Sequence, residues 1–324
     1  MDIEYLIFLQ GLRGDFPGSE FVFTLVSAIP GSPLTALIPA LIFWCVNKRA
    51  GLFLLFLTSF GRLVNQLVKN TACVYRPWLL DSDVHPTAKT LTDSSSYSFP
   101  SGHTNMTTTL YGGLAYLYGK KYPVLILLAV VLIFAVGFSR NFLGAHTPQD
   151  VIAAIVESVA VIFLTGKIFK IAERDDRRET EFFFAGIIIC VAAGIYLMLK
   201  PYPIDYFGGQ IIVTPERAKI DALDSLGGFL GFLLAWQLEK RLINFSTEIP
   251  FRRKIFRLII GGVIGIFMLA IIALLKSFSD PAIYKFCKGF LPYMTLIFFA
   301  PLAFDFFEKK SARRSGRINF GRRR

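Results

Sequence analysis

The sequence PVLILLAVVLIFAVGFS, residues 123–139, decides the fold, because it contains no charged side chain. A helix of about 20 such residues crosses the hydrocarbon core of a bilayer, which is about 30 Å thick. Apolar runs of this kind recur along the chain, at about 22–47, 51–69, 101–119, 123–139, 149–171, 181–200, 222–238, 255–276 and 289–307. They predict an all-α fold, a polytopic transmembrane helical bundle of about nine spans.

The composition favours the same fold class. Of the 324 residues, 54% are hydrophobic and only 18% are charged, with a mean hydropathy of +0.54, which is too apolar for a soluble domain of this length. The runs 101–119 and 222–238 contain polar residues, and a helix of that kind is tolerated where neighbouring helices shield it. Counts of eight or ten spans therefore stay open.

The net charge of +12 comes from short basic clusters between the apolar runs and from the tail after Lys309. This pattern is typical of membrane topology signals and does not favour nucleic acid as a partner. With nine spans, the clusters fall on one side, which should be cytoplasmic. The N-terminus and the linkers 70–100, 140–148 and 201–221 then lie on the extracytoplasmic side. The membrane itself is expected to be a plasma membrane or that of the endoplasmic reticulum.

Three polar groups interrupt the apolar chain near predicted helix ends on the outer side. They are Lys69-x6-Arg76-Pro77, Pro100-Ser101-Gly102-His103 and Ser139-Arg140-x5-His146-x3-Asp150.

Lys69 and Arg76 are about two helical turns apart, so both can reach one anion before Pro77 turns the chain. The alternative is that both side chains extend to lipid headgroups, as terminal basic residues often do.

Ser101, Gly102 and His103 stand directly before an apolar helix, whose unpaired N–H groups and dipole favour an anion. Gly102 lets a ligand approach the backbone, and the Ser101 hydroxyl adds a donor. Ordinary helix initiation is the alternative for Pro100 and Ser101, but it leaves His103 unexplained.

Thr147-Pro148 predicts a helix start that places Asp150 in the first turn, facing His146. A carboxylate on one ring nitrogen leaves the other nitrogen free to attack and stabilises the developing cation. The alternative is a plain capping aspartate.

Together, three cations, a helix N-terminus and two histidines predict a site for phosphoryl transfer. His85 lies in the long linker and is interpreted as a solvated loop residue. The four cysteines have no regular spacing, and no cluster of metal ligands accompanies the three groups, so we expect no metal, no cofactor and no disulfide framework.

At these residues the chain resembles the type 2 phosphatidic acid phosphatase (PAP2) superfamily, whose signature KxxxxxxRP, PSGH and SRxxxxxHxxxD is matched at every fixed position. The resemblance implies a metal-independent phosphatase in which His146 is the nucleophile, Asp150 orients it and His103 is the general acid. The residues implied to hold the phosphate are Lys69, Arg76, Ser101, Gly102 and Arg140.

The expected organisation has four parts. They are an interfacial segment at 1–20, the PAP2-like catalytic core at 21–178, additional transmembrane helices at 179–307 and a basic cytoplasmic tail at 308–324. Two spans precede the first motif and further helices follow the third. This layout is similar to the glucose-6-phosphatase and sphingosine-1-phosphate phosphatase branches.

Several functions stay open. A lipid phosphate or pyrophosphate is favoured, because the motifs lie at helix ends where a headgroup can arrive without leaving the bilayer. The alternatives are a soluble sugar phosphate, transfer of the phosphoryl group to another lipid, a non-enzymatic transporter or scaffold, and a vanadate haloperoxidase, which the hydrophobic chain argues against. The oligomeric state is left open.

Overall fold

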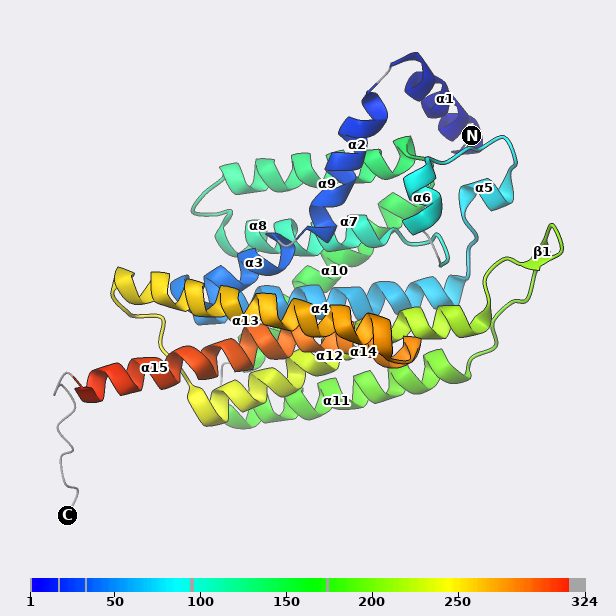
Figure 1. The fold of residues 1–324 in the computed structure, drawn as a ribbon. Helices are drawn as coiled ribbons and strands as arrows, with labels where there is room; N and C mark the ends of the chain where they lie inside the picture. The colour runs from blue at the N-terminus through cyan, green and yellow to red at the C-terminus, as the bar shows by residue number, and fades with distance from the viewer. Residues whose placement is uncertain (1, 17, 33, 94–95, 173–174, 315–324) are drawn as a thin grey trace.

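The structure is a computed structural model, and it describes residues 2–16, 18–32, 34–93, 96–172 and 175–314 (Figure 1). Most of these residues are helical and only two short strands occur among them, which confirms the predicted all-α fold. The elements are α1 (Asp2–Asp15), α2 (Ser19–Ala28), η1 (Ile29–Gly31), α3 (Leu34–Leu41), η2 (Ile42–Val46), α4 (Lys48–Ala72), α5 (Pro77–Leu80), α6 (Ala88–Asp93), α7 (Gly102–Thr107), η3 (Thr108–Gly112), α8 (Gly113–Tyr118), α9 (Val124–Phe142), α10 (Pro148–Ala172), α11 (Asp176–Leu199), β1 (Tyr206–Phe207), β2 (Gln210–Ile211), α12 (Pro215–Leu238), η4 (Glu239–Ile243), α13 (Phe251–Phe278), α14 (Pro281–Met294), η5 (Thr295–Phe299) and α15 (Ala300–Arg314).

Several long helices begin at residues whose side chains cap them. The side chains of Asn47, Asp175, Thr214 and Asp280 each accept a hydrogen bond from a backbone N–H in the first turn of α4, α11, α12 and α14. These N–H groups have no partner inside the helix, so the cap fixes where each helix starts.

Within the described residues, six helical segments are long and apolar enough to cross a membrane: Lys48–Leu80, Val124–Phe142, Pro148–Ala172, Asp176–Leu199, Phe251–Phe278 and Pro281–Lys310. The pair Ser19–Gly31 and Thr35–Val46, bent by 41°, makes a seventh if it is counted as one span. The predicted count of nine is therefore not confirmed. The predicted span 101–119 forms α7, η3 and α8, which continue as one helix from Gly102 to Tyr118 with a π-helical turn in the middle and are too short to be counted among the six. The predicted span 222–238 lies in α12, which is less apolar.

α12 lies at the centre of the bundle, packed against α4, α11 and α14. Its acidic side chains contact protein, since Asp224 pairs with Arg62 of α4 at 2.8 Å and Asp221 pairs with Lys285 of α14 at 2.5 Å. A helix that neighbours shield in this way does not need an apolar surface on every side.

The backbones of α12 and α14 come into close contact. A Cβ added at Gly227 or Gly231 of α12 would lie 2.3 or 2.6 Å from the carbonyl oxygens of Phe286 and Phe290. Gly289 of α14 faces the carbonyl oxygen of Asp224 in the same way. Small residues four positions apart allow helices in membranes to pack this closely, so α14 is attached to the centre of the bundle.

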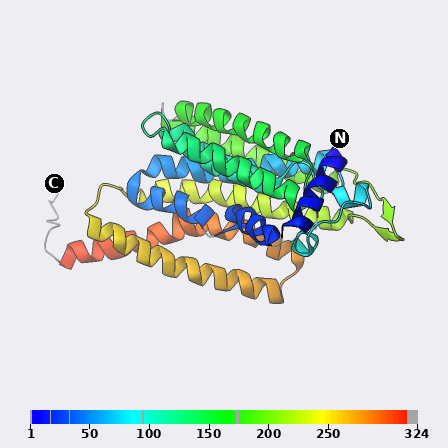
Figure 2. The ribbon, with the colours of Figure 1, turned by 90° about the horizontal axis from the view of Figure 1, so that it is seen from above.

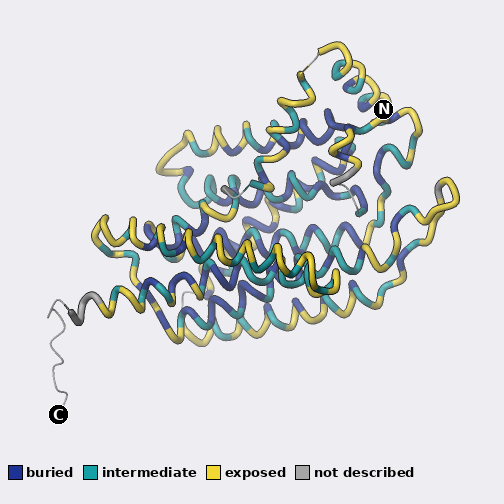
Figure 3. The backbone as a smooth tube through the Cα atoms, in the orientation of Figure 1, coloured by how far each residue is buried: buried dark blue, intermediate teal, exposed yellow. Residues whose placement is uncertain are grey.

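Aromatic rings fill the core between α4, α10 and α12. The centroid of the Phe56 ring lies 5.7 Å from that of Phe169, 5.9 Å from that of Phe229 and 5.4 Å from that of Phe232. Figure 3 shows that α4 and α12 are largely buried, whereas α13 is mostly exposed. Figure 2 places α13 along one edge of the bundle, so its outer surface is free to face lipid.

A buried ion pair holds α13 to the bundle at one end. Arg257 is 1% exposed and donates to both carboxylate oxygens of Glu308 on α15, at 2.8 and 3.0 Å. It also donates to the carbonyl oxygen of Trp44 at 2.9 Å and lies over the ring of Phe304 at 4.5 Å. Arg257 therefore joins α13, α15 and η2.

The opposite end carries the N-terminus, α5, α6 and the hairpin of β1 and β2 (Figure 1). α1 packs against α9, and Arg13 of α1 donates to the carbonyl oxygen of Phe142 at 3.0 Å. Gln10 accepts from the backbone N–H of His85 at 2.7 Å, and His85 itself is exposed. The N-terminal helix thus covers part of the linker between α4 and α7.

Candidate active site

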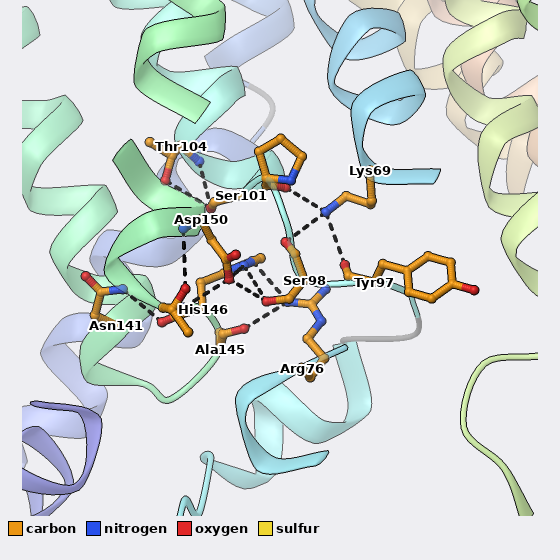
Figure 4. A network of polar contacts seen from close by, with 12 residues as sticks. Lys69, Arg76, Tyr97, Ser98, Ser101, Thr104, Asn141, Ala145, His146 and Asp150 are labelled. Carbon is orange, nitrogen blue, oxygen red and sulfur yellow. Dashed lines mark hydrogen bonds and ion pairs between the residues drawn. The ribbon is translucent and has the colours of Figure 1, made fainter. Parts of the chain in front are cut away.

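The three predicted polar groups meet at the end of the bundle that carries the N-terminus (Figure 4). They come from the end of α4 and the residues after it, from the loop that leads into α7, and from the turn between α9 and α10. Gly102 and His103 are half-buried, and the other predicted site residues are buried: Lys69, Arg76, Ser101, Arg140, His146 and Asp150. Buried charges require partners, and the structure supplies them.

The His146 imidazole has a different partner on each nitrogen. Its Nδ1 lies 3.2 Å from Oδ2 of Asp150, and its Nε2 lies 3.0 Å from Nη1 of Arg76. Because Arg76 can only donate, the tautomer that satisfies both contacts carries its proton on Nδ1. The lone pair of Nε2 then points toward the guanidinium, where an anion would bind.

Asp150 is fixed by three donors besides the ring. The N–H of Thr147 donates to its Oδ2 at 3.0 Å, as the predicted helix start requires, and Ser98 Oγ donates to the same oxygen at 2.5 Å. The third donor is the N–H of Ser101, which binds the carbonyl oxygen of Asp150 at 3.0 Å and ties the start of α7 to α10. The carboxylate therefore has little freedom to turn away from His146.

Arg76 connects two loops. Its Nε donates to the carbonyl oxygen of Ser96 at 3.0 Å, and Nη1 donates to the carbonyl oxygen of Ala145 at 2.9 Å in addition to its contact with His146. The planar guanidinium makes these bonds in fixed directions, so Arg76 sets the position of the turn that carries the nucleophile candidate.

Lys69 donates to three carbonyl oxygens, those of Tyr97, Ser98 and Pro100, at 3.1, 3.1 and 2.6 Å. An ammonium group has three N–H donors, and all three are used here. In this structure Lys69 shapes the loop before α7, and its positive charge lies next to the start of that helix.

Ser101 caps α7, since its Oγ accepts from the N–H of Thr104 at 3.4 Å and from Thr104 Oγ1 at 3.0 Å. The hydroxyl hydrogen of Ser101 is left to donate elsewhere. Gly102 and His103 are the first two residues of α7, where backbone N–H groups have no partner inside the helix. Both predicted interpretations of this segment, helix start and anion site, are compatible with this geometry.

Arg140 ends α9 on the same side of the site. Its Nη1 donates to Ser27 Oγ of α2 at 2.5 Å, and its carbonyl oxygen accepts from the N–H of Ala145 at 2.9 Å. His103 lies in the field of four cations, Arg140, Arg76, Lys69 and Lys89. Two carboxylates, Asp150 and Glu157, act on Lys69, so the four cations outnumber the carboxylates and the site is suited to an anion.

His146 lies in the turn between α9 and α10 and is 2% exposed. Burial, and to a lesser extent the Arg76 guanidinium, hold the pKa of His146 well below its ordinary value, although Asp150 opposes this change. The ring is therefore neutral at physiological pH, as a nucleophile must be.

Three residues near the site were not singled out from the sequence: Ser98, Asn141 and Lys89. Asn141 donates to the carbonyl oxygen of His146 at 2.8 Å. Ser98 Oγ lies 3.3 Å from Nδ1 of His146, in addition to its hydrogen bond to Asp150. Asn141 follows Arg140 directly, so its place in the sequence could have indicated that it lies near the site. Ser98 and Lys89 are ordinary residues of a polar linker, and only the path of that linker brings them here.

Among the described residues, no three His, Cys, Asp or Glu side chains are placed to hold a metal ion. The absence of a cofactor remains a prediction, because nothing in these contacts tests it.

Comparison with known proteins finds two family models along the chain. The model described as the PAP2 superfamily matches residues 50–174, and the model described as the PAP2 superfamily phosphatase transmembrane extension matches residues 223–313. The first contains every predicted site residue. The second contains most of α12 and all of α13 and α14.

Curated relatives also match part of the chain. Phosphatidylglycerophosphatase B of Bacillus subtilis (strain 168) is 31% identical over 139 residues, which are 41% of this chain and 64% of the relative. Glucose-6-phosphatase catalytic subunit 1 of Felis catus is 26% identical over 231 residues, which are 64% of this chain and 63% of the relative, and that of Bos taurus is 25% identical over 231 residues, with the same shares. The chain thus spans less than two thirds of the length of these relatives. No solved structure matches it.

Proposed function

Because the chain belongs to the PAP2 superfamily and is an integral membrane protein, we propose that it is a membrane phosphatase that hydrolyses a lipid phosphate through a phosphohistidine on His146. The observation that carries the proposal is the double contact of the His146 ring, with Asp150 on Nδ1 at 3.2 Å and Arg76 on Nε2 at 3.0 Å.

In the first step, Nε2 of His146 attacks the phosphorus atom of the substrate. The bond between phosphorus and the ester oxygen breaks, and a proton from His103 goes to that oxygen, so no alkoxide is expelled. In the empty site, burial and the neighbouring cations lower the pKa of His103 to about 3, so His103 takes up this proton when the negative phosphate binds beside those cations. Asp150 stabilises the positive charge that develops on the ring. In the second step, a water molecule attacks the phosphohistidine with His103 as the base, which releases inorganic phosphate and restores neutral His146.

The phosphoryl oxygens need donors that are already in place. Arg76 is next to Nε2, so a bound phosphate would take over the hydrogen bond that this guanidinium now gives to His146. Arg140, the Ser101 hydroxyl and the first N–H groups of α7 would bind the other oxygens, with Gly102 leaving room for them. Lys69 would act through its charge and through the loop that it holds.

A lipid substrate is favoured because the site lies at the ends of membrane helices. A headgroup can reach α7 and the turn after α9 while its chains stay in the bilayer. We further propose that this end faces the extracytoplasmic side and that the C-terminus is cytoplasmic, because the basic clusters near Lys48, Lys170 and Lys240 lie at the other end of the bundle.

A sugar phosphate is the second candidate. It is supported by the match to glucose-6-phosphatase, which extends over 64% of this chain and beyond the motifs. Transfer of the phosphoryl group to a second lipid would use the same phosphohistidine, and product analysis separates it from hydrolysis.

The test measures phosphate release by the purified protein in detergent, with EDTA present. The substrates are phosphatidic acid, sphingosine 1-phosphate, a polyprenyl pyrophosphate and glucose 6-phosphate. Release should be lost in His146→Ala and kept in His85→Ala, which removes an exposed histidine of the linker. Phosphate release that survives His146→Ala would refute the mechanism, and a preference for glucose 6-phosphate would replace the lipid substrate.

A further inference from the structure

A long cavity separates α3 from the C-terminal helices α13 and α14. Its volume is about 750 Å³, which is within the usual range of small-molecule sites. Residues from Leu258 to Leu269 of α13 line it, and at 1.5 Å per residue this is a length of about 16 Å. Half of a hydrocarbon core that is about 30 Å thick has nearly the same depth, so the cavity is as long as one leaflet.

The two ends of the cavity differ in chemistry. Arg62 and Lys288 line the end nearer the site, where Arg62 pairs with Asp224 at 2.8 Å. The other end is limited by Trp44, which is 5% exposed, donates to the carbonyl oxygen of Leu296 at 2.7 Å and presses against Gly261. One end of the cavity thus carries Lys288 and the Arg62–Asp224 ion pair, the other end carries the Trp44 indole, and the walls between them are largely apolar.

The same cavity adjoins the candidate active site. Met106, one helical turn after His103 on α7, lines it, and so does Gly31 of η1, which packs against α7. Ser27, four residues before Gly31, accepts the hydrogen bond from Arg140. The part of α7 that lines the cavity is therefore one helical turn from His103, and a lipid headgroup at His103 would have the cavity beside it along α7.

We propose that this cavity, the chain pocket, holds one hydrocarbon chain of the phosphate-bearing lipid whose headgroup reacts at His146. The inference rests on the proposed function and assigns a role to α13 and α14. Bilayer chains are as apolar as the pocket, so entry gains little from burial alone. The pocket instead fixes the distance between the headgroup and Nε2 of His146, with Arg62 and Lys288 next to the polar part of the lipid.

Two glycines of α13 make the chain pocket testable. A Cβ added at Gly262 or Gly265 would have no other atom within 4 Å, apart from its own helix and chain neighbours, so a leucine at either position extends into open space. Val263→Phe is the matched control, because it also adds four heavy atoms to α13, but at a residue that is 63% exposed and does not line the pocket.

Each variant is assayed on dihexadecanoyl phosphatidic acid at fixed mole fraction in detergent micelles, and on water-soluble dibutanoyl phosphatidic acid. Gly262→Leu and Gly265→Leu should lower the ratio of the long-chain rate to the soluble rate by roughly tenfold to hundredfold, since a small misplacement of the reacting group has effects of this size. Val263→Phe should leave the ratio unchanged.

The outcomes separate the two proposals. Equal ratios in the glycine variants and the wild type would overturn the chain pocket and leave the phosphatase proposal intact. Hydrolysis of only the soluble ester by the wild type would overturn the lipid substrate, and the chain pocket with it. Should the leucine variants fail to fold, the wild-type protein is photo-crosslinked with phosphatidic acid that carries a diazirine in its chain, and the labelled residues are identified. Adducts between Leu258 and Leu269 support the pocket, and adducts confined to other helices refute it.

Discussion

Nη1 of Arg76 lies 3.0 Å from Nε2 of His146, on the side of the ring away from Asp150. The guanidinium therefore occupies the direction from which phosphorus would approach and holds the ring in place until a substrate takes over its hydrogen bond. The same group donates to the carbonyl oxygens of Ser96 and Ala145, so in the proposed mechanism one side chain would position both the phosphate and the nucleophile.

Arg76→Lys should lower kcat/KM by about a hundredfold, although the charge is kept. An ammonium cannot make the same set of directed bonds, and loss of one positioned donor in an active site costs about this much. Initial rates on the best substrate measure it. Arg177→Lys is the control, because Arg177 is an exposed residue paired with Glu181. A variant that keeps a tenth or more of the wild-type activity would show that charge alone matters at position 76.

Ser98→Ala should lower kcat roughly tenfold to a hundredfold and change KM little. Ser98 Oγ donates to Asp150 at 2.5 Å, and a hydrogen bond to a charged group contributes about 1.5 to 3 kcal/mol. Without it the carboxylate can turn, and His146 loses its fixed orientation. Ser225→Ala, in which a buried serine of α12 loses a bond to its own helix, is the control. A rise in KM alone would indicate that Ser98 binds substrate instead.

Part of the site could be predicted because the residues that interact there are close in sequence. Asp150 follows His146 by four residues across a helix start, so sequence spacing predicts that the carboxylate can face the ring, and the structure places them 3.2 Å apart. The partners of Lys69 depend on how the residues between Arg76 and Pro100 fold back. No local pattern specifies that path, so the three carbonyl oxygens and the role of Ser98 could not be foreseen.

The fold, too, could be predicted from the sequence in some parts and not in others. Hydropathy predicts that α9 crosses the membrane, because a helix with much of its surface facing lipid needs apolar residues there. It describes α12 poorly, since Asp221 and Asp224 are matched by Lys285 and Arg62 on other helices. The π-helical turn within the predicted span 101–119 has no signal in hydropathy either. A span count made from hydropathy therefore fails where helices shield one another.

Acid should destabilise the protein through His146. The pKa of His146 is lowered in the folded state, mainly by burial and then by Arg76, while the unfolded chain titrates near 6.5. Below about pH 6.5 the unfolded state binds a proton that the folded state does not, so the free energy of unfolding falls as the pH falls. Thermal unfolding of the wild type and His146→Gln between pH 7.5 and pH 5, with phosphate absent, measures the effect. The variant should lose less stability in acid, and parallel curves would contradict the depressed pKa.

Gly102→Ala should lower activity about tenfold without destabilising the protein. The nearest atom to a Cβ built there, leaving out its chain neighbours and its own helix backbone, is Oδ1 of Asn65 at 3.8 Å, which is an ordinary contact, and alanine is favoured over glycine in a helix. Any loss must then come from the ligand, because a methyl group would keep phosphoryl oxygens away from the first N–H groups of α7. Gly194→Ala is the matched control. Gly194 is in α11, away from the site, and a Cβ added there would also lie 3.8 Å from its nearest atom. The measurements are kcat/KM and the unfolding temperature of both variants. Full activity in Gly102→Ala would mean that the phosphate does not bind at the start of α7, and the cations alone would then have to hold it.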